Sequence, residues 1–576
     1  MVDVVFITPN TNGELADESV GTLLLATILS EKGIDCEILQ FFRIGELSDF
    51  DGFTHNAVKI IGNLQPKIVS FYTRCDTHHI VLKLAEVIKK KFPHIYIVFG
   101  GPQSDITAEE TVKNVPFVDF VCCGEGENTV YPLFSSLIEN RPRYDVPGLV
   151  YRQNGVVRKN ERPALICDLD SIPMIDYSKL RYKKIDAKEN GSYFPIDVGR
   201  GCPFACTYCS TKTVWGRKYR LKSPERIVNE IKYIHDKFEV NNFVFAHDMF
   251  TLNREKVIET CGLIKDLPFG IKWKCSARLD CIDKELIDVM ADAGMENIYI
   301  GIETGSARMQ KLINKNLKLD NVATMTEYIA SKNIGVTASF IYGFPDETED
   351  DWSKTLSVIA SLIPIRNVNL QAHLCTFLPG TELTEKYKEN MKPVKYFSDI
   401  TGNVAIEECR DIIDAYPTLF THLLEYQSEL RTRLRFFKTF VFTWKYMEPV
   451  YSYIAEKYDS EKLIQMYFDF AEANEELLEN MKDLPSAEWL PNLIRNDKFV
   501  EKFSDDEYYD IISDFYRMKI AETSDEIANG GSIVDFYCFS PMDRRKYKSL
   551  KDYKRCVAPV RFSGNGDGKV HINLLN

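Results

Sequence analysis

Three cysteines lie close together just after Gly201, at Cys202, Cys206 and Cys209. Their spacing is C-x-x-x-C-x-x-C, so three thiolates can bind three irons of a four-iron, four-sulfur cluster. The next cysteine is Cys261, too far along the chain to extend the motif. A structural cluster or zinc site would normally have a fourth protein ligand. The spacing therefore predicts a cluster whose fourth iron keeps an open coordination site for chemistry.

The residues around these cysteines are typical of one enzyme superfamily. Tyr208 directly precedes the last cysteine, and Arg200 and Gly201 open the loop after a strand-like run that begins at Phe194. This combination resembles the radical S-adenosylmethionine (SAM) superfamily. The resemblance implies that SAM chelates the open iron and that an electron from the cluster cleaves it to a 5′-deoxyadenosyl radical. The alternative is a set of buried or zinc-binding cysteines without this chemistry.

Length, composition and charge favour a soluble, cytoplasmic protein of several domains. The 576 residues, 45% of them hydrophobic, exceed what one core can hold, and three or four domains are expected. A net charge of −13 argues against a general nucleic-acid-binding surface. We expect no export signal and no membrane span, because the amino terminus lacks a basic start and no long uncharged apolar window occurs. The 15 cysteines then indicate reduced thiols and one cluster in an oxygen-poor cytoplasm.

Short apolar runs alternate with helical patterns through residues 1–140, which predicts a doubly wound α/β domain with a parallel sheet. Ligands of such sheets bind at the carboxyl ends of the strands. Unusual loops follow the predicted strands at these ends. They are Thr8-Pro9-Asn10, Thr73-Arg74-Cys75, Gly100-Gly101-Pro102-Gln103 and Gly124-Glu125-Gly126-Glu127.

The two glycine-rich loops resemble those of the cobalamin-binding domain that precedes many radical SAM enzymes. The cobalt-ligating motif of that family, Asp-x-His-x-x-Gly after the first strand, is absent, and His78 and His79 follow the wrong strand. We therefore expect cobalt without a histidine ligand from the protein, or, as the alternative, a domain that has lost cobalamin. The resemblance implies cobalamin binding by Thr8, Pro9, Asn10, Thr73, Arg74, Cys75, Gly100, Gly101, Gln103, Gly124, Glu125 and Gly126.

Residues 141–190 read as a linker with a small hairpin at Asn154-Gly155. From 191 to 400, strands and helices alternate as in a partial (β/α)6 radical SAM barrel, whose site lies where the strands end. The basic residues from Trp215 to Arg220 are interpreted as a solvated face, with contact to the substrate as the alternative. The resemblance implies that Asp248 receives the SAM amino group, Arg278 the carboxylate and Glu303 the ribose. It places SAM against Phe204, Tyr208, Asp248, Arg278, Glu303, Ser339 and Gly343.

Residues 401–576 are predicted to form a mainly helical domain related to the substrate. Leucine and phenylalanine recur at helical spacing from Leu419 to Val441, which predicts one apolar helix face. The aromatic residues from Phe436 to Tyr453 form part of a core or, alternatively, line a substrate cavity.

The combined prediction is a cobalamin-dependent radical SAM methyltransferase that methylates an unactivated carbon of a peptide or secondary metabolite. The resemblance implies an electron donor such as flavodoxin or ferredoxin. We expect a monomer or weak homodimer that binds neither nucleic acid nor membrane, and no catalytic side chain is assigned. One alternative is radical chemistry without methylation, such as epimerisation, rearrangement or crosslinking, and a second is a non-catalytic binding protein.

Overall fold

The structure is a computed structural model, and its described part has several gaps along the chain. It describes residues 2–180, 193–393, 404–446, 448–457 and 460–480, and short pieces between 510 and 574. The chain divides into two compact units. The first comprises Met1–Ile298, Ile313–Lys315 and Thr376–Tyr426, and the second comprises Tyr299–Leu312, Asn316–Cys375 and Gln427–Asn576. No helix among the described residues is long and apolar enough to cross a membrane.

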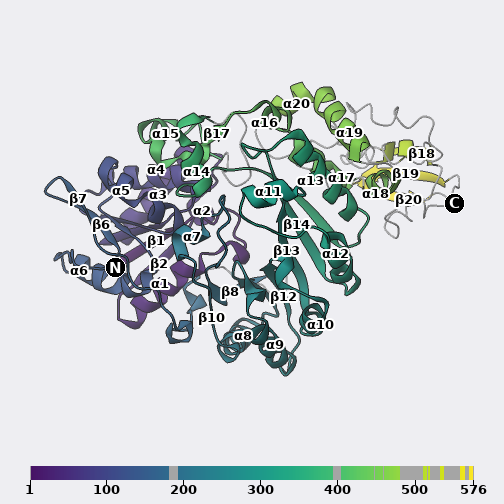
Figure 1. The fold of residues 1–576 in the computed structure, drawn as a ribbon. Coiled ribbons are helices and arrows are strands. Elements are labelled where there is room, and N and C mark those ends of the chain that lie inside the picture. The colour runs from purple at the N-terminus through teal and green to yellow at the C-terminus, as the bar shows by residue number, and fades with distance from the viewer. Residues whose placement is uncertain are drawn as a thin grey trace. The chain divides into compact units, whose positions relative to one another are not determined.

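The first unit opens with a seven-stranded sheet in the order β2-β1-β3-β4-β5-β6-β7 (Figure 1). Strands β1 to β5 are parallel, and their valine, isoleucine and phenylalanine residues are buried. The strands are β1 (Val4–Thr8), β2 (Cys36–Gln40), β3 (Ile68–Tyr72), β4 (Tyr96–Gly100) and β5 (Phe120–Cys122). The connecting helices are α1 (Val20–Glu31), α2 (Phe41–Ile44), α3 (Phe50–Leu64), α4 (His78–Lys91), α5 (Pro102–Asn114) and α6 (Val130–Ile138). The predicted doubly wound parallel sheet is confirmed.

The hairpin predicted at Asn154-Gly155 extends this sheet. Strands β6 (Leu149–Gln153) and β7 (Val156–Lys159) are antiparallel, and β6 pairs with β5. Asn154 and Gly155 have φ of 52° and 77°, the left-handed conformations that a tight two-residue hairpin turn requires.

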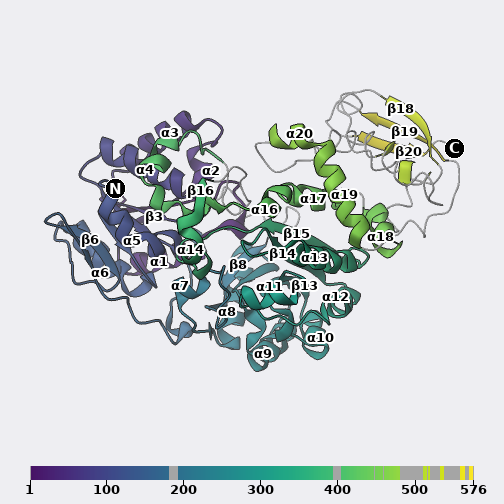
Figure 2. The same ribbon diagram turned by 45° about the horizontal axis from the view of Figure 1, so that its top comes forward.

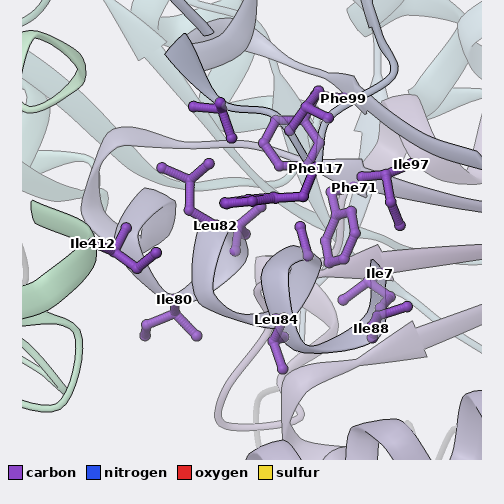
Figure 3. Packing of buried hydrophobic residues seen from close by; sticks show 14 of the residues in the cluster. Ile7, Phe71, Ile80, Leu82, Leu84, Ile88, Ile97, Phe99, Phe117 and Ile412 are labelled. Atoms are coloured by element: carbon purple, nitrogen blue, oxygen red, sulfur yellow. The ribbon is translucent and has the colours of Figure 1, made fainter. Parts of the chain in front are cut away.

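The core of this first domain also includes a segment from far along the chain. Phe71 and Phe99 from the strands and Leu84 from α4 belong to the same buried cluster as Ile412 of α15 (Arg410–Ala415) (Figure 3). The Gln103 side chain donates a hydrogen bond to the Leu419 carbonyl at 2.9 Å. Residues 404–423 are thus an integral layer of the domain that residues 1–140 begin.

Buried histidines make the docking of this segment sensitive to pH. His78 is fully buried between the rings of Phe99 and Phe420, and burial lowers its pKa to about 3. Burial also lowers the pKa of His79 and of His422. Each folded-state pKa lies below the unfolded value near 6.5, so the unfolded chain binds more protons in acid. Their contribution to stability is complete above about pH 6.5 and is lost as the pH falls.

We expect His78 alone to lower the free energy of unfolding by about 1.6 kcal/mol between pH 6.5 and 5, and His79 and His422 to act in the same direction. Chemical denaturation at the two pH values measures this drop. His78→Phe removes one titrating group from an aromatic pocket, so its pH dependence should be shallower than that of the wild type. His94→Gln, at an exposed position, should leave it unchanged. An equally steep dependence in His78→Phe would contradict the assignment.

The second parallel sheet carries the predicted barrel. In the first unit, β8 (Phe194–Asp197), β11 (Asn242–Ala246), β12 (Lys272–Ala277) and the start of β13 (Met295–Glu303) are neighbours in that order. In the second unit, the end of β13 is followed by β14 (Gly335–Tyr342) and β15 (Val368–Leu374). The intervening helices include α8 (Pro224–Phe238), α9 (Arg254–Lys265), α10 (Lys284–Asp292), α12 (Val322–Ser331) and α13 (Glu349–Leu362). The six predicted strands of the partial barrel are confirmed.

Burial alternates along the strands and sets which side chains reach the site. On β12, Trp273, Cys275 and Ala277 are buried, whereas Lys274 and Ser276 are only partly buried. Because strand residues two apart share a face, Arg278 continues the face of Lys274 and Ser276 at the carboxyl end.

Residues 404–480 are mainly helical where the structure describes them, but the single helix face predicted from Leu419 to Val441 is wrong. The chain there forms 3-10 turns up to Leu423, then β17 (Leu424–Tyr426), α16 (Glu429–Arg433) and α17 (Phe437–Tyr446). β17 pairs with β16 (Met391–Pro393), and such pairing requires extended backbone. The helical spacing of the leucines thus arises from short elements that bury them separately.

The aromatic residues of α17 form a core in the second unit. Helices α17, α18 (Glu448–Lys457) and α19 (Ser460–Ala473) contact one another (Figure 2). The ring of Phe437 packs edge-on against Tyr342, Trp352 and Tyr467 at centroid distances of 5.1–5.5 Å. Phe437 is therefore a core residue, as one of the two interpretations of this aromatic segment predicts. Helices α17 and α19 cover the barrel helix α13.

Candidate functional site

The cysteine loop lies between β9 (Gly199–Arg200) and α7 (Thr211–Trp215) in the first unit. Gly201 enters it with φ of 82°, and a Cβ there would stand 2.1 Å from the Lys218 carbonyl oxygen. The middle of the loop is fixed at Thr207, whose N–H donates to Ile313 and whose carbonyl accepts from Leu383, each at 2.9 Å. The loop is therefore held by backbone hydrogen bonds from two distant segments.

The three cysteines of this loop are free thiols in a partly buried setting. Burial raises the pKa of Cys202 to about 11 and also raises that of Cys209. Metal binding must therefore displace protons from these thiols. In the described part of the chain, no three His, Cys, Asp or Glu side chains are arranged to hold a single metal ion. This arrangement is compatible with a four-iron cluster, because each thiolate then binds a different iron atom. Three unpaired thiols in one anchored loop fit the cluster.

Arg278 lies next to the cysteine loop, and one of its three guanidinium nitrogens makes no hydrogen bond to the described residues. Its guanidinium carbon lies 3.9 Å from the ring centre of Phe204. Its Nε and Nη2 donate to the Asp280 carboxylate at 2.9 and 2.8 Å, and Nη2 also donates to the Lys315 carbonyl at 2.8 Å. Its Nη1 is buried and has no hydrogen-bond partner among the described residues. A fixed, buried guanidinium with a free N–H suits a carboxylate ligand.

The loop after β11 brings a carboxylate near the thiols. His247 is buried, and its Nδ1 accepts a hydrogen bond from the Met249 N–H at 2.9 Å, which leaves the ring proton on Nε2. Asp248 next to it is exposed, and its charge contributes to raising the pKa of Cys202 and Cys209. The structure thus brings Asp248 and Arg278 to the cysteine loop. Tyr208 lies within the loop and is half-buried.

Three further predicted SAM contacts lie in the second unit. Glu303 ends β13 with φ of 69°, a strained conformation for a residue other than glycine, and is buried. The turn after it is fixed, because the Gly305 N–H donates to the Thr355 hydroxyl at 3.0 Å. Ser339 is buried on β14, opposite Gln371. Such strain at a strand end is a common property of functional residues.

Gly343 follows β14 in a second constrained turn. It has φ of 77°, its N–H donates to Glu347 at 2.5 Å, and its carbonyl accepts from Arg431 of α16 at 2.8 Å. Burial raises the pKa of Glu347 to about 8. The carboxyl-terminal helices therefore help to fix this strand end.

The predicted cobalamin loops gather at the carboxyl ends of β1, β3, β4 and β5. The Thr73 hydroxyl donates to the Gly100 carbonyl at 3.0 Å and accepts from the Ser104 N–H at 2.9 Å, which joins two loops. The Thr8 hydroxyl is buried without a hydrogen-bond partner in the described ranges, and Asn10 donates to Glu18 at 2.7 Å. An orphaned hydroxyl at the end of β1 fits a ligand with polar side arms, such as cobalamin.

Not all of the predicted cobalamin residues face open space. Arg74 is turned to Asp76, with Nη2 2.7 Å from the carboxylate. Cys75 is partly buried, and this burial raises its pKa to about 12. Gln103 is fixed to Leu419, and Glu125 is buried among arginines. Gln103 and Glu125 therefore hydrogen-bond to other parts of the protein and stabilise the loops. The sequence pattern did not indicate these contacts.

Gly101 tests the cobalamin loops directly. Its φ is 101°, and a Cβ would lie 2.9 Å from the Thr73 backbone. We expect Gly101→Ala to lower the free energy of unfolding by about 2 kcal/mol and to weaken cobalamin binding, because the backbone of either loop must shift. Gly21→Ala in α1, where a Cβ meets nothing within 4 Å, is the matched control and should stabilise by up to about 1 kcal/mol. Unchanged cobalamin affinity in Gly101→Ala would contradict the placement.

Sequence reasoning missed Arg220. The predicted solvated face from Trp215 to Arg220 is confirmed for Arg217 and Lys218, which are exposed. It is wrong for Arg220, whose side chain is buried and donates to Glu125 at 2.7 Å. The available signal was the acidic Gly-Glu-Gly-Glu loop, which needs a buried cation if its glutamates are to leave solvent.

Comparisons with known proteins identify two families along the chain. Residues 17–133 match the B12 binding domain and residues 196–359 match the radical SAM superfamily. These families imply cobalamin, and SAM with a [4Fe-4S] cluster. The structure resembles the radical SAM methyltransferase TsrM from Kitasatospora setae, with a TM-score of 0.57 at 14% identity, covering 68% of this chain and 77% of TsrM. It also resembles the cobalamin-dependent SAM radical enzyme OxsB, with a TM-score of 0.59 at 16% identity, covering 90% of this chain and 75% of OxsB.

Two curated relatives show how far sequence similarity extends. The uncharacterized methyltransferase PH0819 of Pyrococcus horikoshii is 31% identical over 331 residues, covering 57% of this chain and 70% of the relative. The anaerobic magnesium-protoporphyrin IX monomethyl ester cyclase of Cereibacter sphaeroides is 27% identical, covering 55% of this chain, which spans only about half (52%) of that protein. With both domains matched in order, the chain belongs to the cobalamin-dependent radical SAM enzymes, in which a cobalamin-binding domain precedes the radical SAM domain.

Proposed function

We propose that the protein is a cobalamin-dependent radical SAM methyltransferase that methylates an unactivated carbon atom of a peptide or secondary-metabolite substrate. The observation that carries the proposal is the direct link between the two cofactor loops within the first unit. Glu125 of the cobalamin loop accepts a hydrogen bond at 2.8 Å from Arg200, two residues before Cys202. Methyl transfer to a carbon radical requires both cofactors to serve one substrate, and this link favours that arrangement.

When bound, the cluster supplies the electron that splits SAM, and cobalamin supplies a transferable methyl group. The residues of the chain bind the cluster and SAM and orient them. Cys202, Cys206 and Cys209 hold the cluster, Arg278 binds the SAM carboxylate through Nη1, and Asp248 accepts from the SAM ammonium. For the second unit, the resemblance to the family implies that Glu303 would accept from the ribose hydroxyls and that the turn at Gly343 would serve the adenine. Phe204 stacks under Arg278 and keeps its guanidinium in one orientation.

Two observations support a role of the carboxyl-terminal region in substrate selection: the variety of the relatives and the size of this region. A relative from Streptomyces wedmorensis is named cytidylyl-2-hydroxyethylphosphonate methyltransferase, and one from Methylococcus capsulatus is named hopanoid C-3 methylase. The shared domains therefore serve different substrates, and we assign substrate selection to the part of the carboxyl-terminal region that lies in the second unit, residues 427–576. The Arg431 contact with Gly343 supports this role, because it joins that region to a strand end of the barrel.

The test is product analysis of the anaerobically reconstituted full chain with SAM, hydroxocobalamin and a low-potential reductant. The methyltransferase reading predicts iron-sulfur and corrin absorption bands together, and formation of both S-adenosylhomocysteine and 5′-deoxyadenosine. Formation of 5′-deoxyadenosine alone, with or without bound corrin, would favour radical chemistry without methylation. The absence of both cofactors would support a non-catalytic binding protein.

A further inference from the structure

A buried ion network connects the cobalamin loop with the start of the cluster loop. The Glu125 side chain is 1% exposed and accepts from Arg200 Nη1 at 2.8 Å and from Arg220 Nη1 at 2.7 Å. Its second oxygen accepts from the Ile166 N–H at 2.6 Å. The two arginine side chains are 8% and 7% exposed, so the whole cluster of charges is removed from water.

The arginines meet because of strand pairing. β9 and β10 (Arg220–Leu221) form a short antiparallel ladder in which Arg200 stands opposite Arg220. Like charges directly opposite each other destabilise such a pair, and the repulsion grows with burial. Glu125 bridges both guanidiniums and offsets this repulsion. The position of the strand that leads into Cys202 therefore depends on a carboxylate that belongs to the cobalamin domain.

The two arginines differ in their remaining contacts. Arg200 Nη2 also contacts Glu127 at 2.6 Å and Asp197 at 3.2 Å, and both guanidiniums lie 5.6–6.0 Å from the Trp215 ring centre. Arg220 has no carboxylate partner other than Glu125 among the described residues, and its Nε and Nη2 have no hydrogen-bond partner there. Loss of Glu125 would thus leave Arg220 as an uncompensated buried charge.

The position of the Glu125 carboxylate depends on the conformation of the turn that carries it. Glu125 lies between Gly124, with φ of 82°, and Gly126, in the turn that the family assigns to cobalamin. A change in this turn moves the carboxylate. Arg220 then loses its carboxylate partner, and Arg200, which keeps Glu127 and Asp197, is held less tightly at the strand that enters the cluster loop. Buried charge networks are weak sources of stability but can fix one arrangement over others.

We propose that Glu125 is a positioning residue that couples cobalamin binding to SAM binding at the cluster. Cobalamin on the Gly124–Gly126 turn fixes Glu125, Glu125 fixes Arg200, and the cluster loop is then held in the arrangement that binds SAM. Coupling between two sites is reciprocal, so SAM tightens cobalamin by the same factor. The inference rests on the part of the proposed function that names the two cofactors, and not on methyl transfer. The coupling can therefore be disproved while the methyltransferase activity is confirmed, and the reverse also holds.

The experiment measures the dissociation constant of SAM for the cluster-loaded full chain, with and without saturating hydroxocobalamin, by equilibrium binding under anaerobic conditions. For the wild type we expect cobalamin to tighten SAM binding by about fivefold or more. In Glu125→Gln, which keeps the size of the side chain and removes its charge, the ratio should fall to near one. The electron paramagnetic resonance signal of the reduced cluster with SAM should respond to cobalamin in the wild type and not in Glu125→Gln.

Glu230→Gln is the matched control. Glu230 is also a buried carboxylate with two cationic partners, Lys222 at 2.9 Å and Arg226 at 2.6 Å, but it lies on α8 and touches no cobalamin loop. It should keep the coupling. Equal loss of coupling in Glu230→Gln would overturn the proposal, as would a wild type without coupling or a Glu125→Gln protein that retains it.

A second variant covers the case in which Glu125→Gln does not load its cofactors. Arg220→Lys keeps the buried charge but loses the planar donor fork that reaches Glu125. Reduced coupling in Arg220→Lys, with both cofactors bound, supports the proposal, and full coupling overturns it.

Discussion

Replacing Cys202, Cys206 or Cys209 by serine is expected to remove the iron-sulfur cluster and to lower 5′-deoxyadenosine formation by about 1,000-fold or more. Three thiolates are the minimum that leaves one iron open for SAM, and a serine hydroxyl is a poor ligand for iron in such clusters. The loop itself should stay in place, because it is anchored through the Thr207 backbone and not through the thiols. Iron and sulfide analysis and product chromatography measure the two effects.

Cys281 provides the control for this prediction. It is half-buried and lies close enough to Arg278 and Cys202 for their charges to influence its pKa, which burial raises to about 11. If the cluster has only three protein ligands, Cys281→Ser should retain iron, sulfide and SAM cleavage. Loss of the cluster in Cys281→Ser would show a fourth thiolate ligand and would contradict the open iron.

The second large effect is expected at Arg278. In Arg278→Gln the SAM carboxylate loses a charge-assisted hydrogen bond worth about 1.5–3 kcal/mol, so the dissociation constant of SAM should rise by about 10- to 150-fold. The cluster content should stay unchanged, because Arg278 is no cluster ligand. Equilibrium binding of SAM to the cluster-loaded variant measures the change.

Arg254→Gln is the control for Arg278. Arg254 likewise donates to a nearby carboxylate, Asp283 at 2.9 Å, but it is more exposed and makes no contact with Phe204. Its replacement should not change SAM binding. If Arg278→Gln bound SAM as the wild type does, or lost iron instead, Arg278 would be a structural residue of the loop.

The local parts of this site could be predicted from the sequence, because they depend on short-range spacing. The cysteine motif occupies eight residues, and the order of strand-end residues places Asp248 and Arg278 beside it. The alternation of apolar runs likewise predicts both parallel sheets. Each of these signals is carried by residues that are neighbours in the chain or on one strand.

The remaining parts depend on contacts between distant residues. Glu125 is separated from Arg200 by 75 residues and from Arg220 by 95, and no periodic pattern encodes such a pair. The predicted helix from Leu419 failed for the same reason. Its leucine spacing is helical, but Leu419 and Leu423 pack on the first domain and the next residues pair with β16. Tertiary contacts decided the backbone there, and local propensity did not.

The most direct test of the central claim is one anaerobic measurement on the purified full chain after reconstitution with iron and sulfide. The iron-sulfur site with an open iron predicts about four irons and four sulfides per chain, and release of 5′-deoxyadenosine from SAM on reduction. A chain that holds no iron and sulfide, or that holds them and releases no 5′-deoxyadenosine, would contradict the account.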